Sequence, residues 1–551
     1  MLSVSPRRAR LRFLTVKGFL FTMWQVWGWW KFLNEWHPKL MLFNSFTFLL
    51  LFLPLALGGY YLSCAIGHKI AKGWLVGASL VFYGWWSPAY LVLLCGSIAV
   101  NYVIGLLIQA TVGNTTLQRT ILFLGISGNL ALLGFYKYLF PLLHWLGEHG
   151  INLVAPEASV VLPLGISFFT FTQIGYLIDC QAGLTAGGRF LDYTLFVTFF
   201  PHLIAGPILH HREMMPQFES KETMRFRLDR ISIGLAIFFI GLAKKVVIAD
   251  HLRSTVNDGF SLAGNLTIVD SWTAVLAYSM QLYFDFSGYS EMALGLALLF
   301  NIRFPANFDS PYKSASIIEF WQRFHMTFTR YLNLYLYNPI ALWVTRRRTE
   351  AGYPVGRQGL KTGGGFMAMV AFPTFFTMGL AGIWHGAGFN FMIFGLLHAI
   401  YLTVNHGWRL LLHQKSALQP LGSDFWLNRA WKILLTYLAV VVAQIFFRAA
   451  TLPDALAILR NLTGHRLPPP PNSIPIAFPK PLILTFPLIW FAPNVLQMFA
   501  PWEPTLSKPH ALVPPWLQWR PTVTWAVAMA LIAAIAILSV GGATEFLYFR
   551  F

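Results

Sequence analysis

Two histidines lie in apolar surroundings, where an ionisable side chain is costly and therefore a candidate for chemistry. His325 lies in SIIEFWQRFHMTFTRYLNLYLYNP, residues 316–339, and His385 lies in GIWHG, residues 382–386. No Asp, Glu, Lys or Arg occurs from Thr362 to Trp408. Because a neutral imidazole can accept a proton near pH 7, either histidine could act as a general base. For each one alone, a hydrogen-bonded packing role or a place on the polar face of a helix stays open.

Glycines set the surroundings of His385 apart. The nearby glycines are Gly379, Gly382, Gly386 and Gly388. They leave backbone uncovered on several sides, so a ligand or another part of the chain can approach closely. Helix packing without a ligand would give the same pattern. His398, further along the same apolar run, is interpreted as a packing residue.

Two carboxylates interrupt another apolar run, YFDFSGYSE, at Asp285 and Glu291. Buried carboxylates are usually paired, so Asp285 either holds a neighbouring helix or orients a histidine or an arginine of the site. Ser287 does not lie in a G-x-S-x-G turn, and we do not interpret it as a nucleophile.

Motifs for metals and bound cofactors are absent from the sequence. It contains no H-E-x-x-H, C-x-x-C, P-loop or dinucleotide fingerprint, and the His210–His211 pair with Glu213 has no clear further ligand. The spacing of the three cysteines indicates neither a disulfide framework nor a zinc site. We expect no metal and no bound cofactor.

Long apolar helices must position these residues. The chain is 56% hydrophobic and only 11% charged, which is typical of an integral membrane protein. The apolar runs are continuous, which favours spanning helices over a β-barrel. They predict helices near residues 46–66, 73–94, 97–110, 119–146, 161–180, 190–209, 231–250, 270–300, 364–383, 388–405, 430–447, 482–499 and 522–540. Because several are short or broken, we predict an all-α polytopic protein with about eleven transmembrane helices plus re-entrant or amphipathic helices.

The segment around His325 has a pattern of its own. Ser316 followed by Glu319 matches a capping box that begins a helix. Large apolar residues recur at helical spacing from Ile317 to Tyr335, whereas His325 and Arg323 lie off that stripe. We therefore predict an amphipathic or re-entrant helix over residues 316–339.

The distribution of charged residues separates the remaining segments of the chain. Residues 1–40 form a basic and aromatic extension, and residues 41–551 form the membrane domain. The basic, glycine-rich segment near 345–365 is predicted to be a cytoplasmic loop, and the segment near 461–481 is a proline-rich linker. Basic loops facing anionic lipid explain the net charge of +19, so no nucleic-acid partner is expected.

Seven motifs in the chain form an ordered set. They are MLFNSFTFLLLFLPL, LPLGISFFTFTQIGYLID, FPHLIAGPILH, QLYFDFSGYSEMALGLALLFNIRFPANFDSPY, FWQRFH, GIWHGAGFNFMIFGLLHAIYL and FFRAATLPDALAIL. In this order, from Met41 to the terminal FLYFRF, the sequence resembles the membrane-bound O-acyltransferase family. It is most similar to the family's bacterial alginate O-acetyltransferase branch.

The resemblance implies a fold, a site and a reaction. The fold is a ring of tilted helices around a central tunnel, and the active-site pair is His325 and His385, with His385 as the catalytic base. We expect His325 to orient the reacting groups or to stabilise the oxyanion, with support from Trp321, Arg323, Trp384 and Asp285. The reaction moves an acetyl group from a cytoplasmic acyl thioester, acetyl-CoA or an acyl carrier protein, to a hydroxyl of an exopolysaccharide or of a periplasmic transfer partner.

The same resemblance places the protein among the lipids of the bacterial inner membrane, next to a periplasmic acetyltransferase or a polysaccharide-synthesis complex. Two departures from the family pattern, Leu332-Asn333 and IALWVTRRR, put the choice of acyl donor or the docking of a partner in question. The alternatives are transfer of D-alanyl or another acyl group to a cell-wall polymer, or a non-catalytic transporter or scaffold. No inverted repeat supports the transporter.

Overall fold

The computed structural model describes residues 41–151, 161–185, 188–415, 424–464, 478–541 and 547. Within these ranges the chain forms helices and no strand, and an isolated antiparallel bridge joins Phe308 and Phe324. The all-α class is confirmed. The extension at residues 1–40 and most of the proline-rich linker, residues 465–477, lie outside the described residues.

Six helices in the described part of the chain are long and apolar enough to cross a membrane. They are Thr47–Ile66, Pro88–Ala110, Thr115–Glu148, Leu228–Ser261, Gly363–His385 and Leu427–Arg448. Shorter apolar helices cover Lys480–Trp490 and Val523–Leu538. Membrane-protein character is therefore clear, whereas the number of about eleven spans stays a prediction.

The first group of helices, at the N-terminal end of the described chain, differs from the sequence prediction at one helix boundary, between Trp86 and Pro88. The group consists of α2 (Leu53–Ile66), α3 (His68–Trp86), α4 (Pro88–Ala110), α5 (Thr115–Gly134), α6 (Phe140–Glu148) and α7 (Ile166–Gln181). The helix predicted over residues 73–94 is wrong, because α3 ends at Trp86 and α4 begins two residues later. Ser87 accepts a hydrogen bond from the backbone N–H of Tyr90, and Pro88 occupies the first helical position.

Short helices follow where a spanning helix was expected over residues 190–209. They are α8 (Phe190–Thr198), α9 (Phe200–Leu203) and α10 (His211–Glu219). Phe199 leaves the helical conformation, and α9 begins at Phe200 with Pro201 in its first turn, so this part of the prediction is wrong.

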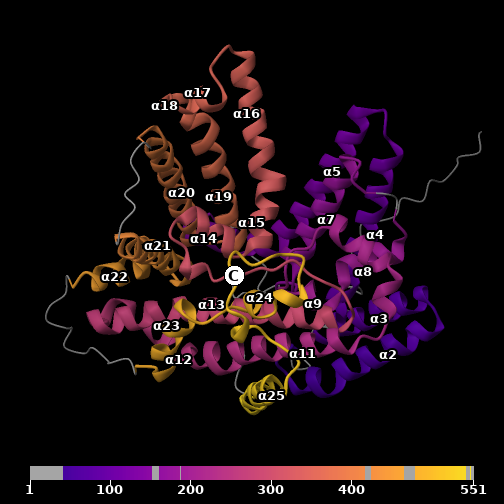
Figure 1. Ribbon diagram of the computed structural model, residues 1–551. Coiled ribbons are helices and arrows are strands. Elements are labelled where there is room, and N and C mark those ends of the chain that lie inside the picture. Colours follow the sequence, from indigo (N-terminus) through magenta and orange to yellow (C-terminus); the bar gives the residue numbers. More distant parts are fainter. Residues whose placement is uncertain are drawn as a thin grey trace, which may run out of the picture.

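Two long helical segments form the base of the molecule as drawn in Figure 1. α11 (Leu228–Ala243) continues through the π-helical turn η4 (Lys244–Ala249) into α12 (Asp250–Ser261), and it packs along α13 (Ile268–Leu299). Glycines let the two backbones touch, because a Cβ at Gly241 would lie 2.5 Å from the carbonyl oxygen of Gly288. α13 is consequently buried along almost its whole length.

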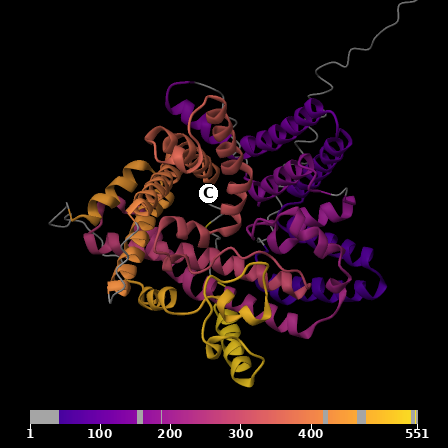
Figure 2. The ribbon, with the colours of Figure 1, turned by 45° about the horizontal axis from the view of Figure 1, so that its top comes forward.

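The second half of the chain carries both candidate histidines. Its helices are α14 (Ile317–Arg323), α15 (Met326–Leu332), α16 (Asn338–Glu350), α17 (Gly356–Leu360), α18 (Gly363–Phe366), α19 (Phe372–His385), α20 (Phe389–Lys415), α21 (Asp424–Arg448) and α22 (Leu452–Leu462). Figure 1 shows the indigo helices α2 and α3 and the orange helices α21 and α22 on opposite sides of the molecule, and Figure 2 likewise shows indigo and orange segments far apart. The segment at 345–365, expected as a loop, is mostly helical, since Arg and Glu continue α16 to Glu350.

The last helices are α23 (Lys480–Trp490), α24 (Val495–Met498) and α25 (Val523–Leu538). The single helix expected over residues 482–499 is wrong, because the chain leaves the helical conformation between Trp490 and Asn494. Asn494 begins α24 with a capping box shared with Gln497.

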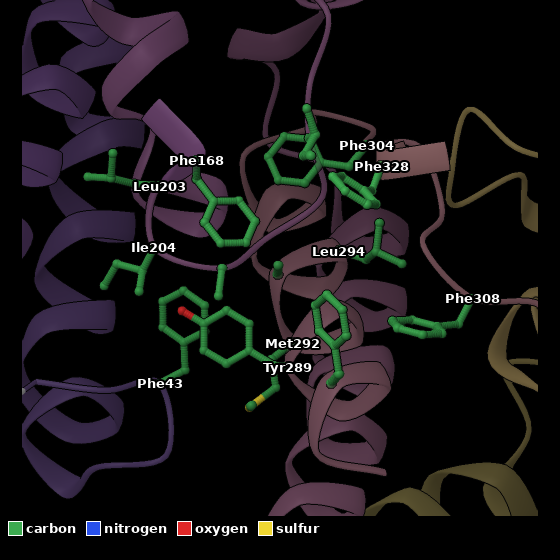
Figure 3. Close-up of a cluster of buried hydrophobic side chains, with 14 of the residues drawn as sticks. Phe43, Phe168, Leu203, Ile204, Tyr289, Met292, Leu294, Phe304, Phe308 and Phe328 are labelled. Carbon is green, nitrogen blue, oxygen red and sulfur yellow. The ribbon is translucent and has the colours of Figure 1, made fainter. Parts of the chain in front are cut away.

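Aromatic side chains from distant segments fill the core between these groups, as Figure 3 shows. Phe43, which precedes the first helix, stacks on Tyr289 of α13 with ring centroids 4.9 Å apart. Phe168 of α7 and Phe328 of α15 extend this cluster. Stacked rings of this kind add specific geometry to hydrophobic burial, so the core fixes α13, α7 and α15 relative to one another.

Candidate active site

His325 lies at a break between two short helices. α14 begins as predicted, with the Ser316 side chain accepting from the backbone N–H of Glu319. The continuous helix expected over residues 316–339 is wrong, because His325 has a φ of 46°, in the left-handed region. A residue other than glycine is strained there by about 1–3 kcal/mol, and such strain concentrates at functional sites.

The strand-like segment before α14 holds this break in place. The backbone N–H of Asp309 donates to the carbonyl of Arg323 at 2.9 Å, and that of Met326 donates to the carbonyl of Asn307 at 2.9 Å. The break at His325 is therefore fixed by tertiary hydrogen bonds from another segment, and no local helix signal could reveal it.

Asn307 also fixes the imidazole of His325. Its side-chain Oδ1 lies 3.0 Å from Nδ1 of His325, and it accepts from Oγ1 of Thr327 at 2.9 Å. Because an amide oxygen can only accept, Nδ1 of His325 carries the hydrogen. In the neutral ring Nε2 then carries the lone pair, as a proton acceptor requires.

His385 is the last residue of α19, and side chains from the first group of helices hold that helix end. Nζ of Lys137 donates to the carbonyls of Trp384 at 2.5 Å and of His385 at 2.9 Å. The hydroxyl of Tyr138 donates to the carbonyl of Ile383 at 2.7 Å. A helix leaves its last carbonyls without partners inside the helix, and a cation there also matches the negative end of the helix dipole.

The glycines near His385 serve helix packing at one clear position. A Cβ at Gly382 would lie 2.4 Å from the carbonyl oxygen of Phe391, and a Cβ at Gly395 would lie 2.3 Å from that of Met378. α19 and α20 therefore touch through their backbones. The glycine pattern could indicate either a ligand or helix packing. At Gly382 the structure shows helix packing.

One narrow cavity brings three histidines together. This histidine cavity is lined by His325, His385 and His398, together with aromatic side chains that include Trp321 and Phe447. Its volume is about 30 Å³, enough for one or two water-sized groups and too small for a sugar ring. The two histidines that the sequence singled out thus meet, 60 residues apart in the chain by their numbers (385 − 325).

A second cavity lies on another side of His385. This lysine cavity has a volume of about 290 Å³ and is lined by Lys137, Ser167, Trp384 and His385, among others. His385 is therefore part of the lining of both a small aromatic cavity and a larger one.

Phe328 links the two predicted histidines and a predicted tryptophan. Its ring centroid lies 4.9 Å from that of His325, 5.7 Å from that of His385 and 4.7 Å from that of Trp384. Trp384 also stacks on Phe171 at 5.0 Å. These rings place apolar surface next to both histidines, which limits the access of water to them.

Of the other expected supporting residues, Trp321 reaches the site, whereas Arg323 and Asp285 make their ion pairs elsewhere. Nε1 of Trp321 donates to Nδ1 of His398 at 3.2 Å. Arg323 forms an ion pair with Glu319 at 2.6 Å. Asp285 forms an ion pair with Nζ of Lys245 at 2.5 Å, and its other oxygen accepts from the backbone N–H of Leu547 at 3.1 Å. The structure therefore favours the helix-holding interpretation of Asp285.

Three residues that lie at the site were not selected from the sequence, although Lys137 and His398 are ionisable residues in apolar runs and could have been selected on that signal. The partners of Asn307 and Lys137 are distant in the chain, so the sequence gives no indication of their contacts. His398 was interpreted as a packing residue, yet it lines the histidine cavity. A hydrogen bond between Trp321 and His398, across 77 residues, is what joins it to the site.

The polar residues around His210 make contacts with other side chains of the same chain. Glu213 forms a two-pronged ion pair with Arg330, with N–O distances of 2.5 and 2.9 Å. Burial and the nearby Arg330 guanidinium lower the pKa of His210 to about 4, so its imidazole is neutral. Among the described residues no group of three or more His, Cys, Asp or Glu side chains is arranged to hold a metal ion.

Comparisons to known proteins define the class of this chain. Residues 185–350 match the sequence profile described as MBOAT, membrane-bound O-acyltransferase family. The chain is also 38% identical over 456 residues to the peptidoglycan O-acetyltransferase of Helicobacter pylori, covering 77% of this chain and 80% of that protein. The chain belongs to the membrane-bound O-acyltransferase family and is an O-acyltransferase.

Two further relatives are named for different acyl transfers. The chain is 38% identical over 424 residues to the protein named "Probable alginate O-acetylase" of Pseudomonas aeruginosa, covering 75% of this chain and 73% of that protein. It is 27% identical over 249 residues to the teichoic acid D-alanyltransferase of Bacillus subtilis, covering 45% of this chain and 60% of that protein.

Proposed function

We propose that this protein transfers an acetyl group from a thioester on the cytoplasmic side of the bacterial inner membrane to a hydroxyl of a cell-envelope glycan, or to a periplasmic protein that passes it on. The observation that carries the proposal is the meeting of His325 and His385 at one small, aromatic-walled cavity. This arrangement suits a reaction that needs a base and the exclusion of water.

In the proposed reaction His385 is the general base. Its imidazole takes the proton of the acceptor hydroxyl while the hydroxyl oxygen bonds to the thioester carbonyl carbon. The carbon–sulfur bond then breaks, and the departing sulfur takes up the proton from His385. His325, held by Asn307 with a lone pair on Nε2, accepts a hydrogen bond from a neighbouring hydroxyl of the acceptor and so orients the acceptor.

The size of the histidine cavity supports acetyl as the group that is transferred. A volume of about 30 Å³ leaves room for only a small group beside the three histidines. The names of the two relatives at 38% identity, a peptidoglycan O-acetyltransferase and a probable alginate O-acetylase, point to the same group. The relative named for D-alanyl transfer is less similar, at 27% identity.

The basic segment that includes the end of α16 is the proposed approach for the acyl donor. Arg346, Arg347, Arg357 and Lys361 are exposed there. By the positive-inside rule this segment lies in the cytoplasm, where its charge attracts the phosphates of acetyl-CoA or the acidic surface of a carrier protein. No cofactor needs to stay bound, because the thioester is a substrate.

Reconstituted vesicles distinguish this enzyme from a transporter. Vesicles carrying the protein would enclose oligosaccharides of peptidoglycan or, in a separate preparation, of alginate, and [14C]acetyl-CoA would be added outside. The proposal expects label covalently bound to glycan or to protein, with free CoA as the second product. Intact labelled acetyl-CoA inside the vesicles, with no covalent label, would identify a transporter and overturn the proposal.

A further inference from the structure

His398 occupies a place at the site that packing alone does not require. It is 1% exposed, and it lines the histidine cavity together with His325 and His385. Its ring contacts that of Trp321 with centroids 5.0 Å apart and that of Phe394 at 4.7 Å. A third imidazole at a cavity of about 30 Å³ is close to whatever reacts there.

Trp321 determines which nitrogen of His398 carries the hydrogen. Nε1 of Trp321 lies 3.2 Å from Nδ1 of His398, and an indole N–H can only donate. Nδ1 of His398 is therefore the acceptor, and in the neutral ring the hydrogen is on Nε2. The remaining polar atom of this cavity-lining ring is a hydrogen-bond donor.

His398 and His325 therefore have opposite tautomers. Asn307 accepts from Nδ1 of His325, which leaves a lone pair on Nε2, whereas Trp321 donates to Nδ1 of His398, which leaves an N–H at Nε2. Neither Asn307 nor Trp321 is a titrating group, so each one sets the tautomer whenever its histidine is neutral. One cavity thus holds one fixed acceptor and one fixed donor beside His385.

We infer that His398 donates a hydrogen bond from Nε2 to the oxyanion formed during acyl transfer. This inference rests on the proposed function. When the hydroxyl oxygen bonds to the carbonyl carbon, the carbonyl oxygen becomes negative, and a fixed N–H in a water-poor cavity stabilises that charge. The charge returns to the carbon–oxygen double bond when the carbon–sulfur bond breaks. Trp321 acts through His398 and is a positioning residue.

Two amide substitutions test the donor atom. The amide nitrogen of Gln lies near the place of imidazole Nε2, whereas that of Asn lies near Nδ1, so His398→Gln keeps the donor and His398→Asn loses it. With purified protein and [14C]acetyl-CoA as the probe, His398→Asn should lower kcat by about 100-fold, as removal of an oxyanion donor does. His398→Gln should lower kcat by less than about tenfold, and the KM for acetyl-CoA should change little in either variant.

Trp321→Phe supplies a second variant that leaves His398 in place. It keeps an aromatic ring and removes the N–H that fixes the tautomer, so kcat should fall several-fold without a matching rise in KM. In protein labelled with 15N-histidine, the His398 signal, identified by its absence in His398→Gln, should report hydrogen on Nε2 in the wild type. Trp321→Phe should shift that signal toward the other tautomer.

Several outcomes would overturn the inference. They are equal losses of kcat in His398→Asn and His398→Gln, wild-type kcat in His398→Asn, hydrogen on Nδ1 of His398 in the wild type, or loss of folded protein in all three variants. His385→Ala is measured alongside. If His385→Ala keeps transfer, the proposed function falls; if it loses transfer while His398→Asn keeps it, only this inference falls.

Discussion

Nδ1 of His325 lies 3.0 Å from Oδ1 of Asn307, and this one contact fixes both the orientation and the tautomer of a predicted active-site histidine. The same oxygen accepts from the backbone N–H and the hydroxyl of Thr327, at 3.3 and 2.9 Å. Asn307 therefore holds the strained turn at His325 as well as its ring. A substitution at Asn307 reaches the chemistry without touching the substrate.

Asn307→Ala should lower kcat by at least tenfold. It removes the acceptor for His325 Nδ1 and for Thr327, and each buried donor left without a partner costs about 1–3 kcal/mol. The measurement is acetyl transfer per folded molecule, with the thermal unfolding temperature in detergent recorded beside it. Asn101→Ala is the matched control, because Asn101 is a buried asparagine paired with Asn129 outside both cavities. Equal activity in the two variants would contradict the role of Asn307.

Lys137→Met should lower transfer by at least tenfold while the protein still accumulates in the membrane. The methionine fills similar space but cannot donate to the carbonyls of Trp384 and His385, so the last turn of α19 loses its anchor. Transfer per folded molecule measures the effect. Lys69→Met, the same change at an exposed lysine of α3, should behave like the wild type. Transfer within twofold of wild type in Lys137→Met would show that the end of α19 needs no anchor.

Asp285→Ala should weaken the fold more than the chemistry. The carboxylate pairs with Lys245 and accepts from the backbone of Leu547, so its loss leaves two buried groups with fewer partners. We expect a loss of about 1–3 kcal/mol in the free energy of unfolding, since Lys245 keeps Asp250 at 2.8 Å. Activity per folded molecule should stay within about threefold of wild type. A stable variant with at least tenfold lower kcat would instead assign Asp285 to the reaction.

Reversing charge on the basic segment should affect acyl-donor binding. The double change Arg346→Glu and Arg347→Glu places two acidic side chains on the exposed end of α16. The KM for acetyl-CoA should rise several-fold at low salt and approach the wild-type KM at high salt, because exposed charges are screened. The kcat should not change. Arg119→Glu, at another exposed position, serves as the control, and an equal KM rise in the control would remove the role of this segment.

The sequence was sufficient to predict the class, and the two histidines that it selected lie at one cavity. Composition predicted an all-α membrane protein, and the ordered motifs predicted the family to which the chain belongs. His325 and His385 were selected as ionisable groups in apolar runs, and both line the histidine cavity. The ring of Trp384 contacts that of His385, and Trp321 lines the histidine cavity.

The residues that fix the geometry could not be predicted in the same way. Lys137 and His385 are 248 residues apart, so no periodicity joins them. The break at His325 depends on backbone hydrogen bonds from residues 307 and 309, whereas the apolar stripe favours one continuous helix. Prolines and caps, at Ser87 and Pro201, likewise divided segments whose hydropathy alone indicated single spans.

The most direct test is the degree of O-acetylation of the exported glycan in cells that carry His385→Ala. Membrane abundance of the protein is measured in the same cells, and His144→Ala, at an exposed histidine, serves as the control. With His385 as the base, acetylation falls to the level of cells that lack the protein, at normal abundance, while the control keeps the wild-type level. Near-normal acetylation with His385→Ala at normal abundance would contradict the central role of this histidine.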